Sequence, residues 1–270
     1  MKRGLSTIST VSASFAEDVE AYAAAGFDAI GLWEFKLPED DASSRAVLAD
    51  RGLSVANCIP TVPSFLPLAI PGMEGPDDPE VRIEAICASV RRLAAYEPES
   101  ILCLSGPLGG RSSKEGRAIV IEGLRAAAAA ARETGVRLGF EPIHPSQHDT
   151  AGFVCSLADA LALLEEAGAA DVGIMADTYN LVRENPADIA AVAARVTGLH
   201  VADEAVPAVP GVRVLPGEGS GRTRELVAAL RTVSWDGTLD VEIFSTPDTF
   251  WSLPVDEAAR RAYAAVSALL

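Results

Sequence analysis

The segment LGFEPIHPSQHDT, residues 138–150, begins as a short apolar run and then brings charged and imidazole groups close together. Glu141 follows the apolar run directly, and His144 and His148 come soon after it. The whole chain has only three histidines, so two of them in one short segment indicate a role beyond forming a turn. A buried carboxylate is costly without a partner, so Glu141 predicts a partner elsewhere in the chain.

Seven further apolar runs of similar length alternate with longer amphipathic stretches. The predicted strands are 5–9, 29–33, 54–59, 100–104, 137–141, 173–177, 198–201 and 240–244. Helical stretches with apolar residues three and four apart lie between them and after the last, and several end at glycine. Eight strands, each followed by a helix, predict an α/β fold with a single (β/α)8 TIM barrel over residues 1–270. The alternative, a doubly wound open sheet, is weakened because no GxGxxG turn follows the first strand.

Composition narrows the possible partners. The net charge of −16 opposes binding to nucleic-acid phosphates and docking on anionic membranes. The four cysteines form no CxxC pair and are expected to be free thiols in a reducing compartment. The sequence starts without an apolar signal region, and no apolar run reaches the length of a membrane span. We therefore expect a cytoplasmic protein with no nucleic-acid or membrane partner.

Four successive predicted strands each carry a side chain that binds metal ions. Glu141 ends the fifth strand, Asp177 ends the sixth, His200 lies on the seventh and Glu242 on the eighth. Since the chemistry of such barrels lies at the C-terminal ends of the strands, the four should share one rim. Three carboxylates would repel one another there without a cation. Oxygen ligands with one imidazole suit Mn²⁺, which we expect first, or Mg²⁺ or Co²⁺. We predict one such ion.

Six motifs at these positions resemble one known family. They are GFDAIGLWEFKL (26–37), GFEPIHP (139–145), MADTYNL (175–181), LHVADE (199–204), RVLPGEG (213–219) and LDVEIF (239–244). Over nearly all of the chain the sequence resembles the xylose-isomerase-like TIM-barrel superfamily, in its sugar phosphate isomerase/epimerase branch. The resemblance implies that Glu141, Asp177, His200 and Glu242 hold the metal. It also implies that Glu141 and Glu242 exchange protons with the substrate and that Arg213 contacts it.

Further residues near these motifs are candidates for binding substrate. Trp33 is expected to form an apolar wall, and Lys36 to bind a hydroxyl or carbonyl oxygen. His144 is expected to hydrogen-bond substrate or a metal ligand, and Asp203 to orient the neighbouring imidazole or to contact substrate. Asn180 stands where the epimerases usually carry histidine and is expected to hydrogen-bond substrate. The structural alternatives are rim packing for Trp33, a solvated lysine for Lys36 and a turn cap for Asn180.

The predicted site supports one kind of chemistry with several outcomes. A divalent ion bound to a carbonyl oxygen and a neighbouring hydroxyl would stabilise a developing enediolate while a carboxylate removes the α-proton. Returning the proton to the opposite face gives epimerisation, and returning it to the adjacent carbon gives isomerisation. We therefore predict a metal-dependent isomerase or epimerase of a sugar or cyclitol. The alternative is a lyase that expels a leaving group, such as an inosose-type dehydratase or an enzyme cleaving 3-oxo-glycosides or C-glycosides.

The loop at 59–76 supports this alternative. It is rich in proline and apolar residues, so we expect it to pack over the barrel mouth or against another subunit, as in a homo-oligomer, and to suit an aglycone. Two other classes remain in competition. A DNA repair enzyme like endonuclease IV would need more histidines and a basic groove. A non-catalytic sugar-binding barrel would not need all four ligand types.

Overall fold

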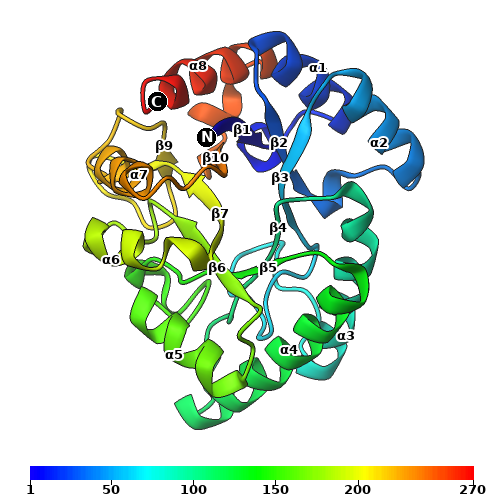
Figure 1. The fold of residues 1–270 in the computed structure, drawn as a ribbon, viewed down its shortest axis with the longest axis vertical. Helices are drawn as coiled ribbons and strands as arrows, with labels where there is room; N and C mark the ends of the chain where they lie inside the picture. Colours follow the sequence, from blue (N-terminus) through cyan, green and yellow to red (C-terminus); the bar gives the residue numbers. More distant parts are fainter.

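The computed structural model describes residues 1–270 and contains a closed barrel of eight parallel strands surrounded by helices (Figure 1). The barrel strands are β1 (Lys2–Ser6), β2 (Ala29–Trp33), β3 (Ser54–Ile59), β4 (Ser100–Cys103), β5 (Leu138–Phe140), β6 (Gly173–Asp177), β7 (Val196–Val201) and β10 (Thr238–Val241). Around the barrel they follow the order β1-β10-β7-β6-β5-β4-β3-β2. The predicted (β/α)8 TIM barrel is therefore confirmed.

Eight helices cover the outside of the barrel. They are α1 (Phe15–Ala25), α2 (Asp41–Asp50), α3 (Pro79–Leu93), α4 (Ser113–Thr134), α5 (Leu157–Ala167), α6 (Pro186–Ala191), α7 (Thr223–Thr232) and α8 (Val255–Ser267). Local sequence fixes several of their ends. Ser14 and Ser112 begin α1 and α4 with capping boxes, which satisfy free backbone N–H groups of the first turn. Gly26, Gly135 and Gly168 end three helices in the left-handed conformation that glycine adopts without strain.

Strand bounds agree with the sequence except at particular ends. Strands β2, β3 and β6 have the predicted bounds, whereas β1 begins at Lys2, three residues earlier than expected. Residues Thr7–Thr10 form a 3-10 turn instead of continuing the strand. The apolar pattern misses the true start because Lys2 and Arg3 occupy it, and their charges are paired with Glu99 and Asp28.

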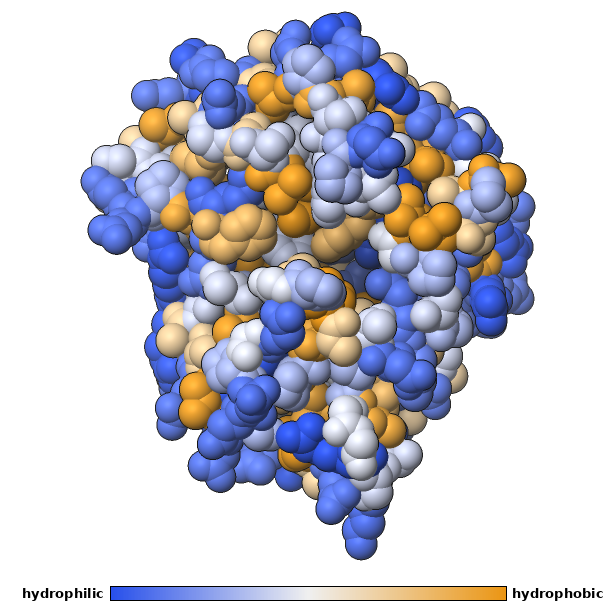
Figure 2. All heavy atoms as spheres, turned by 180° about the vertical axis from the view of Figure 1, so that it is seen from behind, coloured by the Kyte–Doolittle hydropathy of each residue, from blue (hydrophilic) through white to orange (hydrophobic).

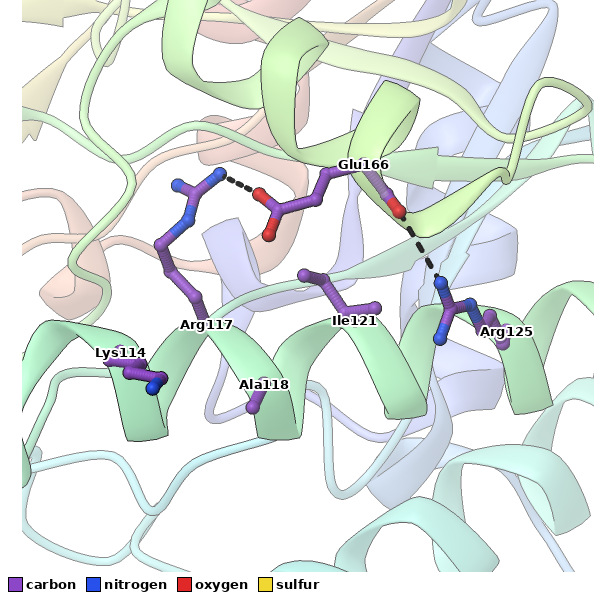
Figure 3. A pocket seen from close by; sticks show the side chains of 6 residues that line it. All are labelled: Lys114, Arg117, Ala118, Ile121, Arg125 and Glu166. Carbon is purple, nitrogen blue, oxygen red and sulfur yellow. Dashed lines mark hydrogen bonds and ion pairs between the residues drawn. The ribbon is translucent and has the colours of Figure 1, made fainter.

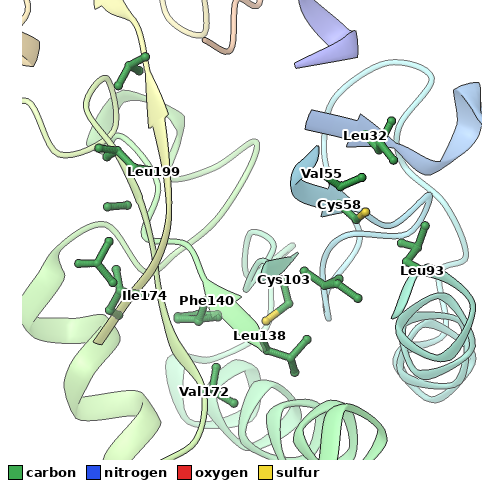
Figure 4. Packing of buried hydrophobic residues seen from close by; sticks show 14 of the residues in the cluster. Leu32, Val55, Cys58, Leu93, Cys103, Leu138, Phe140, Val172, Ile174 and Leu199 are labelled. Carbon is green, nitrogen blue, oxygen red and sulfur yellow. The ribbon is translucent and has the colours of Figure 1, made fainter. Parts of the chain in front are cut away.

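Buried apolar residues form two clusters of different size. A cluster of 56 buried residues fills the space between strands and helices, and Figure 4 shows part of it, including Leu93 of α3 and Phe140 of β5. A separate cluster of eight gathers mainly at the C-terminal ends of the strands: Ile8, Trp33, Ile59, Leu102, Leu104, Ile143, Ala151 and Met175. The face opposite to that in Figure 1 carries apolar and intermediate residues near its centre and hydrophilic ones at its outline (Figure 2). One end of the barrel interior is therefore lined by its own small apolar cluster.

The apolar loop after β3 is packed against the barrel instead of projecting from it. Phe65 and Leu66 are fully buried, and their backbone N–H groups donate to the carbonyls of Leu104 and Ser105. Arg82 of α3, also fully buried, donates to the backbone carbonyls of three loop residues and to one hydroxyl. These acceptors are the carbonyls of Ser64, Glu74 and Pro76, and Ser64 Oγ. The guanidinium group of Arg82 thus attaches the loop to α3.

The long connection after β7 forms a small antiparallel hairpin. Its strands are β8 (Asp203–Glu204) and β9 (Arg213–Val214). Arg213 also donates its backbone N–H to the carbonyl of Phe244, beyond β10. The hairpin therefore anchors the Arg213 backbone beside the end of the last barrel strand. None of the helices combines the length and apolar character that a membrane span requires.

Candidate metal centre

Four metal-competent side chains meet at the C-terminal ends of neighbouring strands. Glu141 and Glu242 lie just after β5 and β10, Asp177 ends β6, and His200 lies on β7 directly opposite Asp177 in register. All four are nearly or fully buried. One ligand atom each from Glu141, Asp177 and His200 lie within 4.8 Å of one another. The order of strands explains this meeting, because β5, β6, β7 and β10 are consecutive around the barrel.

The imidazole of His200 connects the carboxylates. Its Nδ1 atom lies 3.6 Å from Glu141 Oε1 and 3.4 Å from Glu242 Oε2. On its other side, Nε2 lies 3.2 Å from Oδ1 of Asn57, which belongs to β3 across the barrel. Nδ1 itself has no hydrogen-bond partner and is fully buried. His200 therefore presents one nitrogen to the carboxylates while the other is held by an amide.

Arg213 lies between two of the carboxylates. Its Nη1 atom is 2.8 Å from Asp177 Oδ2 and 2.7 Å from Glu242 Oε2. The guanidinium carbon lies 5.0 Å from the ring centres of both Tyr179 and Phe244. Stacking on aromatic faces suits a buried guanidinium, so the arginine is held in a fixed position beside the candidate ligands.

Asn180 and His144 complete the polar side of the site. Asn180 Nδ2 donates to Glu141 Oε1 at 3.1 Å and to Asp177 Oδ2 at 3.3 Å, and its Oδ1 accepts the backbone N–H of His144. The His144 ring accepts the backbone N–H of Ser146 at Nδ1, so a neutral ring carries its proton at Nε2. That Nε2 atom is buried and has no hydrogen-bond partner. Glu204 Oε1 lies 3.9 Å from this atom, beyond hydrogen-bond distance, so His144 offers a free donor.

Burial and charge shift the protonation of these groups. Burial raises the pKa of Glu141 from 4.5 to about 7, although His200 opposes the change. Burial alone would lower the pKa of His200, but the charges of Glu242 and Glu141 outweigh it and raise that pKa to about 10. Burial also lowers the pKa of the His144 ring. In Arg213, burial opposes the charged form, and Asp177 and Glu242 nevertheless raise its pKa.

These residues fit a divalent cation. His200 Nδ1 and Glu242 Oε1 are buried polar atoms without hydrogen-bond partners, as expected of atoms that bind an ion. Three carboxylates and one imidazole are a donor set for Mn²⁺, Mg²⁺, Co²⁺ or Zn²⁺. The compact group of Glu141, Asp177 and His200 would hold the ion, with Glu242 adjoining through His200 and Arg213.

Lys36 and Asp203, two further candidates for binding substrate, have contacts outside this cluster. The ammonium of Lys36 forms a buried ion pair with Asp18 at 2.6 Å and donates to the carbonyls of Thr7 and Thr10. Its observed contacts are therefore structural, and none is with the carboxylate cluster. Its burial also differs from the solvated lysine considered as an alternative. The carboxylate of Asp203 accepts the backbone N–H of Gly217 and so fixes the turn after the hairpin.

Trp33 lies in the small apolar cluster at the barrel mouth. Its ring forms edge-on contacts with Phe35 and Phe244, each with ring centres 5.7 Å apart. Because Phe244 also contacts Arg213, this aromatic group reaches the polar cluster. The placement is compatible with the expected apolar wall and equally with rim packing.

Sequence reasoning missed two buried polar residues beneath the cluster. Asn57 of β3 and Asp240 of β10 are at most 1% exposed. The sequence did indicate Asn57, because it is the one amide within an apolar predicted strand. Asp240 also stands two positions before Glu242, and residues two apart share a face of a strand. The alternation places Asp240 of β10 and Glu242 just after it on the same side, toward the barrel interior.

The surface cavity shown in Figure 3 is not this site. It has a volume of 650 Å³ and is lined only by α4, the end of α5 and their side chains: Lys114, Arg117, Ala118, Ile121, Arg125 and Glu166. Arg117 is paired with Glu166, and Arg125 donates to backbone carbonyls at the end of α5. Its two arginines therefore already have partners, and its lining includes none of Glu141, Asp177, His200 and Glu242.

Comparison with known proteins establishes the family. A family model described as a xylose isomerase-like TIM barrel matches residues 19–267. With the barrel and the strand-end cluster already described, the chain belongs to the xylose isomerase-like TIM-barrel family. No protein of curated function matches the sequence significantly.

Several solved structures share the fold at low sequence identity. A protein from Sinorhizobium meliloti 1021 superposes with a TM-score of 0.85 at 23% identity, over 99% of this chain and 98% of that one. The IolI protein, described with a bound zinc atom, superposes with a TM-score of 0.79 at 16% identity, over 100% of this chain and 98% of that one. D-allulose 3-epimerase from Methylomonas sp. superposes with a TM-score of 0.75 at 17% identity, over 100% of this chain and 98% of that one. At such identities the likeness shows a common fold.

Proposed function

We propose that this protein is a divalent-metal-dependent isomerase or epimerase of a sugar or cyclitol, acting by proton transfer at the carbon next to a carbonyl. One observation carries the proposal: Glu141, Asp177, His200 and Glu242 form a buried cluster at the ends of four consecutive strands. The family membership and the similar structures named for an epimerase and for a zinc-containing protein support it.

The two glutamates differ in a way that suits acid–base work. A bound divalent ion would polarise the substrate carbonyl and make the neighbouring C–H more acidic. Glu141 is a buried carboxylate at the proposed site, a type of group that can accept a proton from carbon as a general base and return it. Glu242 is oriented by Arg213 at 2.7 Å and follows another strand, β10. One glutamate would remove the proton and the other would return it.

The surrounding polar groups would orient the substrate. Arg213 is fixed between two aromatic rings and carries donors that suit a hydroxyl or carbonyl oxygen. The unpartnered Nε2–H of His144 is a second donor with a defined direction. Asn180 donates to Glu141 and Asp177, so its role is to position these carboxylates.

Solvent exchange at the α-carbon tests the enolising chemistry across several classes of substrate. Ketoses, inososes and 3-oxo-glycosides would be incubated in D₂O with the Mn²⁺-loaded protein, and deuterium at the α-carbon would be followed by NMR. We expect exchange with at least one compound, and its loss in Glu141→Gln and Glu242→Gln. Tight Mn²⁺ binding without exchange in any compound would contradict the enolising function, and retention of exchange in both variants would contradict the assigned roles.

The aromatic group at the mouth supports a second candidate, a lyase with an apolar leaving group. Phe35, Trp33, Phe244 and Trp251 form a continuous series of ring contacts with centres 5.7 to 6.3 Å apart. Phe35 is 50% exposed, so the series begins at the surface, and its third ring, Phe244, lies beside Arg213. Aromatic faces bind apolar rings well. A substrate with a polar sugar head and an aryl substituent would fit both regions.

Comparing substrates would separate the two candidates. A 3-oxo-glycoside with an aryl aglycone would be compared with its methyl analogue, with release of the aglycone followed by chromatography. Release that is faster for the aryl compound in wild type, and equal for both in Phe35→Ser, would favour the lyase. Deuterium exchange without release would favour the isomerase or epimerase.

A further inference from the structure

A chain of three buried polar side chains crosses the barrel interior beneath the candidate metal centre. His200 Nε2 lies 3.2 Å from Asn57 Oδ1, and Asn57 Nδ2 donates to Asp240 Oδ2 at 2.8 Å. All three residues are at most 1% exposed. Strand β3, which carries Asn57, lies opposite β7 in the barrel order, whereas β10 is the neighbour of β7. The amide therefore reaches across the interior to join two adjacent strands.

The donors and acceptors in this chain have a fixed direction. The carboxylate of Asp240 accepts hydrogen bonds, so it draws the NH₂ end of the Asn57 amide toward itself. The carbonyl end then faces His200 and can only accept, which requires a proton on Nε2. When the ring is neutral, its lone pair must be on Nδ1, the nitrogen that lies 3.4 Å from Glu242 and 3.6 Å from Glu141.

The neighbouring strands leave room for this arrangement. A Cβ atom on Gly31 of β2 would lie 2.1 Å from Asp240 Oδ2, and one on Gly4 of β1 would lie 3.2 Å from Oδ1. Both strands lie between β3 and β10 in the barrel order. Because any larger side chain at Gly31 would displace the carboxylate, glycine there is part of what keeps Asp240 in contact with Asn57.

We infer that Asn57 and Asp240 are positioning residues that hold His200 in the tautomer whose Nδ1 binds a metal ion. The inference rests on the metal-dependent function proposed above and adds to it the groups that prepare the ligand. The partner of a metal-bound imidazole fixes its orientation and tautomer, and its loss typically weakens metal binding by about 10- to 100-fold. The same range is expected here.

The first experiment measures metal affinity in matched variants. Asn57→Leu keeps the approximate size but removes the acceptor, and should weaken Mn²⁺ or Zn²⁺ binding by about 10- to 100-fold. Gly31→Ala leaves all three polar residues intact and should weaken binding by displacing Asp240. As a control, Ser100→Ala removes a buried hydrogen bond to Thr197 in the same barrel interior and should leave metal affinity unchanged. Wild-type affinity in both folded Asn57→Leu and Gly31→Ala would overturn the inference.

A second readout does not depend on metal or activity. In ¹⁵N-histidine-labelled, metal-free protein, the Nε2–H of His200 should give a proton resonance that exchanges slowly with solvent, because it is buried and bonded to Asn57. The resonance should be lost or exchange rapidly in Asn57→Leu and persist in Ser100→Ala. In the Zn²⁺-loaded protein, Nε2 should keep its proton and Nδ1 should show the shift of a metal-bound nitrogen.

The two readouts separate this inference from the proposed function. Absence of a protected Nε2–H in wild type would overturn the positioning role even if metal binds. A protected Nε2–H that depends on Asn57, in a protein that binds neither Mn²⁺ nor Zn²⁺, would confirm the hydrogen bond but overturn both the metal-dependent function and the ligand-preparing role. Zinc binding through Nε2 would overturn the positioning role alone.

Discussion

Two buried groups of charged side chains in this protein differ in the ratio of acids to cations. Lys36 and Asp18 form a one-to-one ion pair with side chains at most 5% exposed, and Thr10 adds a hydrogen bond to Asp18. The strand-end cluster, taken together with Asp240 beneath it, instead has more acids than cations: Glu141, Asp177, Asp240 and Glu242 against Arg213 and His200. A balanced buried pair needs nothing more, whereas surplus carboxylates call for a cation. Charge balance, more than burial, therefore separates the structural cluster from the candidate site.

Removing a ligand from the unbalanced cluster should have the largest effect. Asp177→Ala is expected to abolish tight Mn²⁺ binding and all turnover, because Asp177 belongs to the compact ligand group. Its loss should exceed the about 10- to 100-fold typical of residues that only support a ligand. Calorimetric titration would measure the binding, and circular dichroism would show that the barrel is folded. Full activity in this variant would refute the proposed site.

Breaking the balanced pair should affect stability instead. Asp18→Asn leaves the ammonium of Lys36 buried without its counter-charge, and should lower the free energy of unfolding by about 3–5 kcal/mol. Urea denaturation would measure this, with Mn²⁺ affinity of the folded protein unchanged. A variant of normal stability with weakened substrate binding would instead favour the substrate-contacting role predicted for Lys36.

The pH dependence of metal binding should reveal the protons held in the unbalanced cluster. With pKa values of about 7 for Glu141 and about 10 for His200, protons compete with the metal. Affinity should therefore rise with pH most steeply below about pH 7, and uptake at about pH 8 should release about one proton, from His200 Nδ1. Calorimetry in two buffers of different ionisation enthalpy would count the protons. A proton count of zero would contradict the raised pKa of His200.

In the metal-free protein both raised pKa values make stability fall as pH rises, which is opposite to their effect on metal affinity. Glu141 has a raised pKa, so the folded state binds a proton that the unfolded state lacks, and its contribution to stability falls as pH rises from 4.5 to about 7. His200 contributes stability that is complete below its ordinary value of 6.5 and is lost as pH rises to about 10. Mn²⁺ should flatten both trends in thermal unfolding experiments, because it replaces the proton at each group.

The smallest effect on Mn²⁺ affinity is expected from removing a positive charge from the strand-end cluster, which increases its excess of acids. Arg213→Met removes a cation beside Asp177 and Glu242, so Mn²⁺ should bind several-fold more tightly while turnover falls. As a control, Arg222→Met removes an arginine that contacts Glu184 and Glu225 outside the cluster and should change neither quantity. Weaker Mn²⁺ binding in Arg213→Met would show that the guanidinium supports the ligands by orienting them more than it opposes the metal by its charge.

The fold and the meeting of the four candidate ligands were predictable from sequence because they depend on short-range patterns. Strands such as 173–177 show their bounds in an uninterrupted apolar run that ends in an acid, and topology then brings the strand ends together. The environment of Lys36 was not predictable, because its partner Asp18 lies on α1 and only the folded chain joins them. Likewise, the partnership of Asn57 with His200 spans the barrel, and nothing in local spacing indicates it.

The attachment of the 59–76 loop bears on how this barrel can change over evolutionary time. Arg82 holds the loop through backbone carbonyls and one hydroxyl, while Ile70 and Met73 pack against the apolar cluster at the mouth. Contacts to backbone carbonyls do not depend on which side chains the loop carries. Residues 70 and 73 can therefore be exchanged without altering the course of the loop, so mutation can reshape the mouth independently of the strand-end cluster.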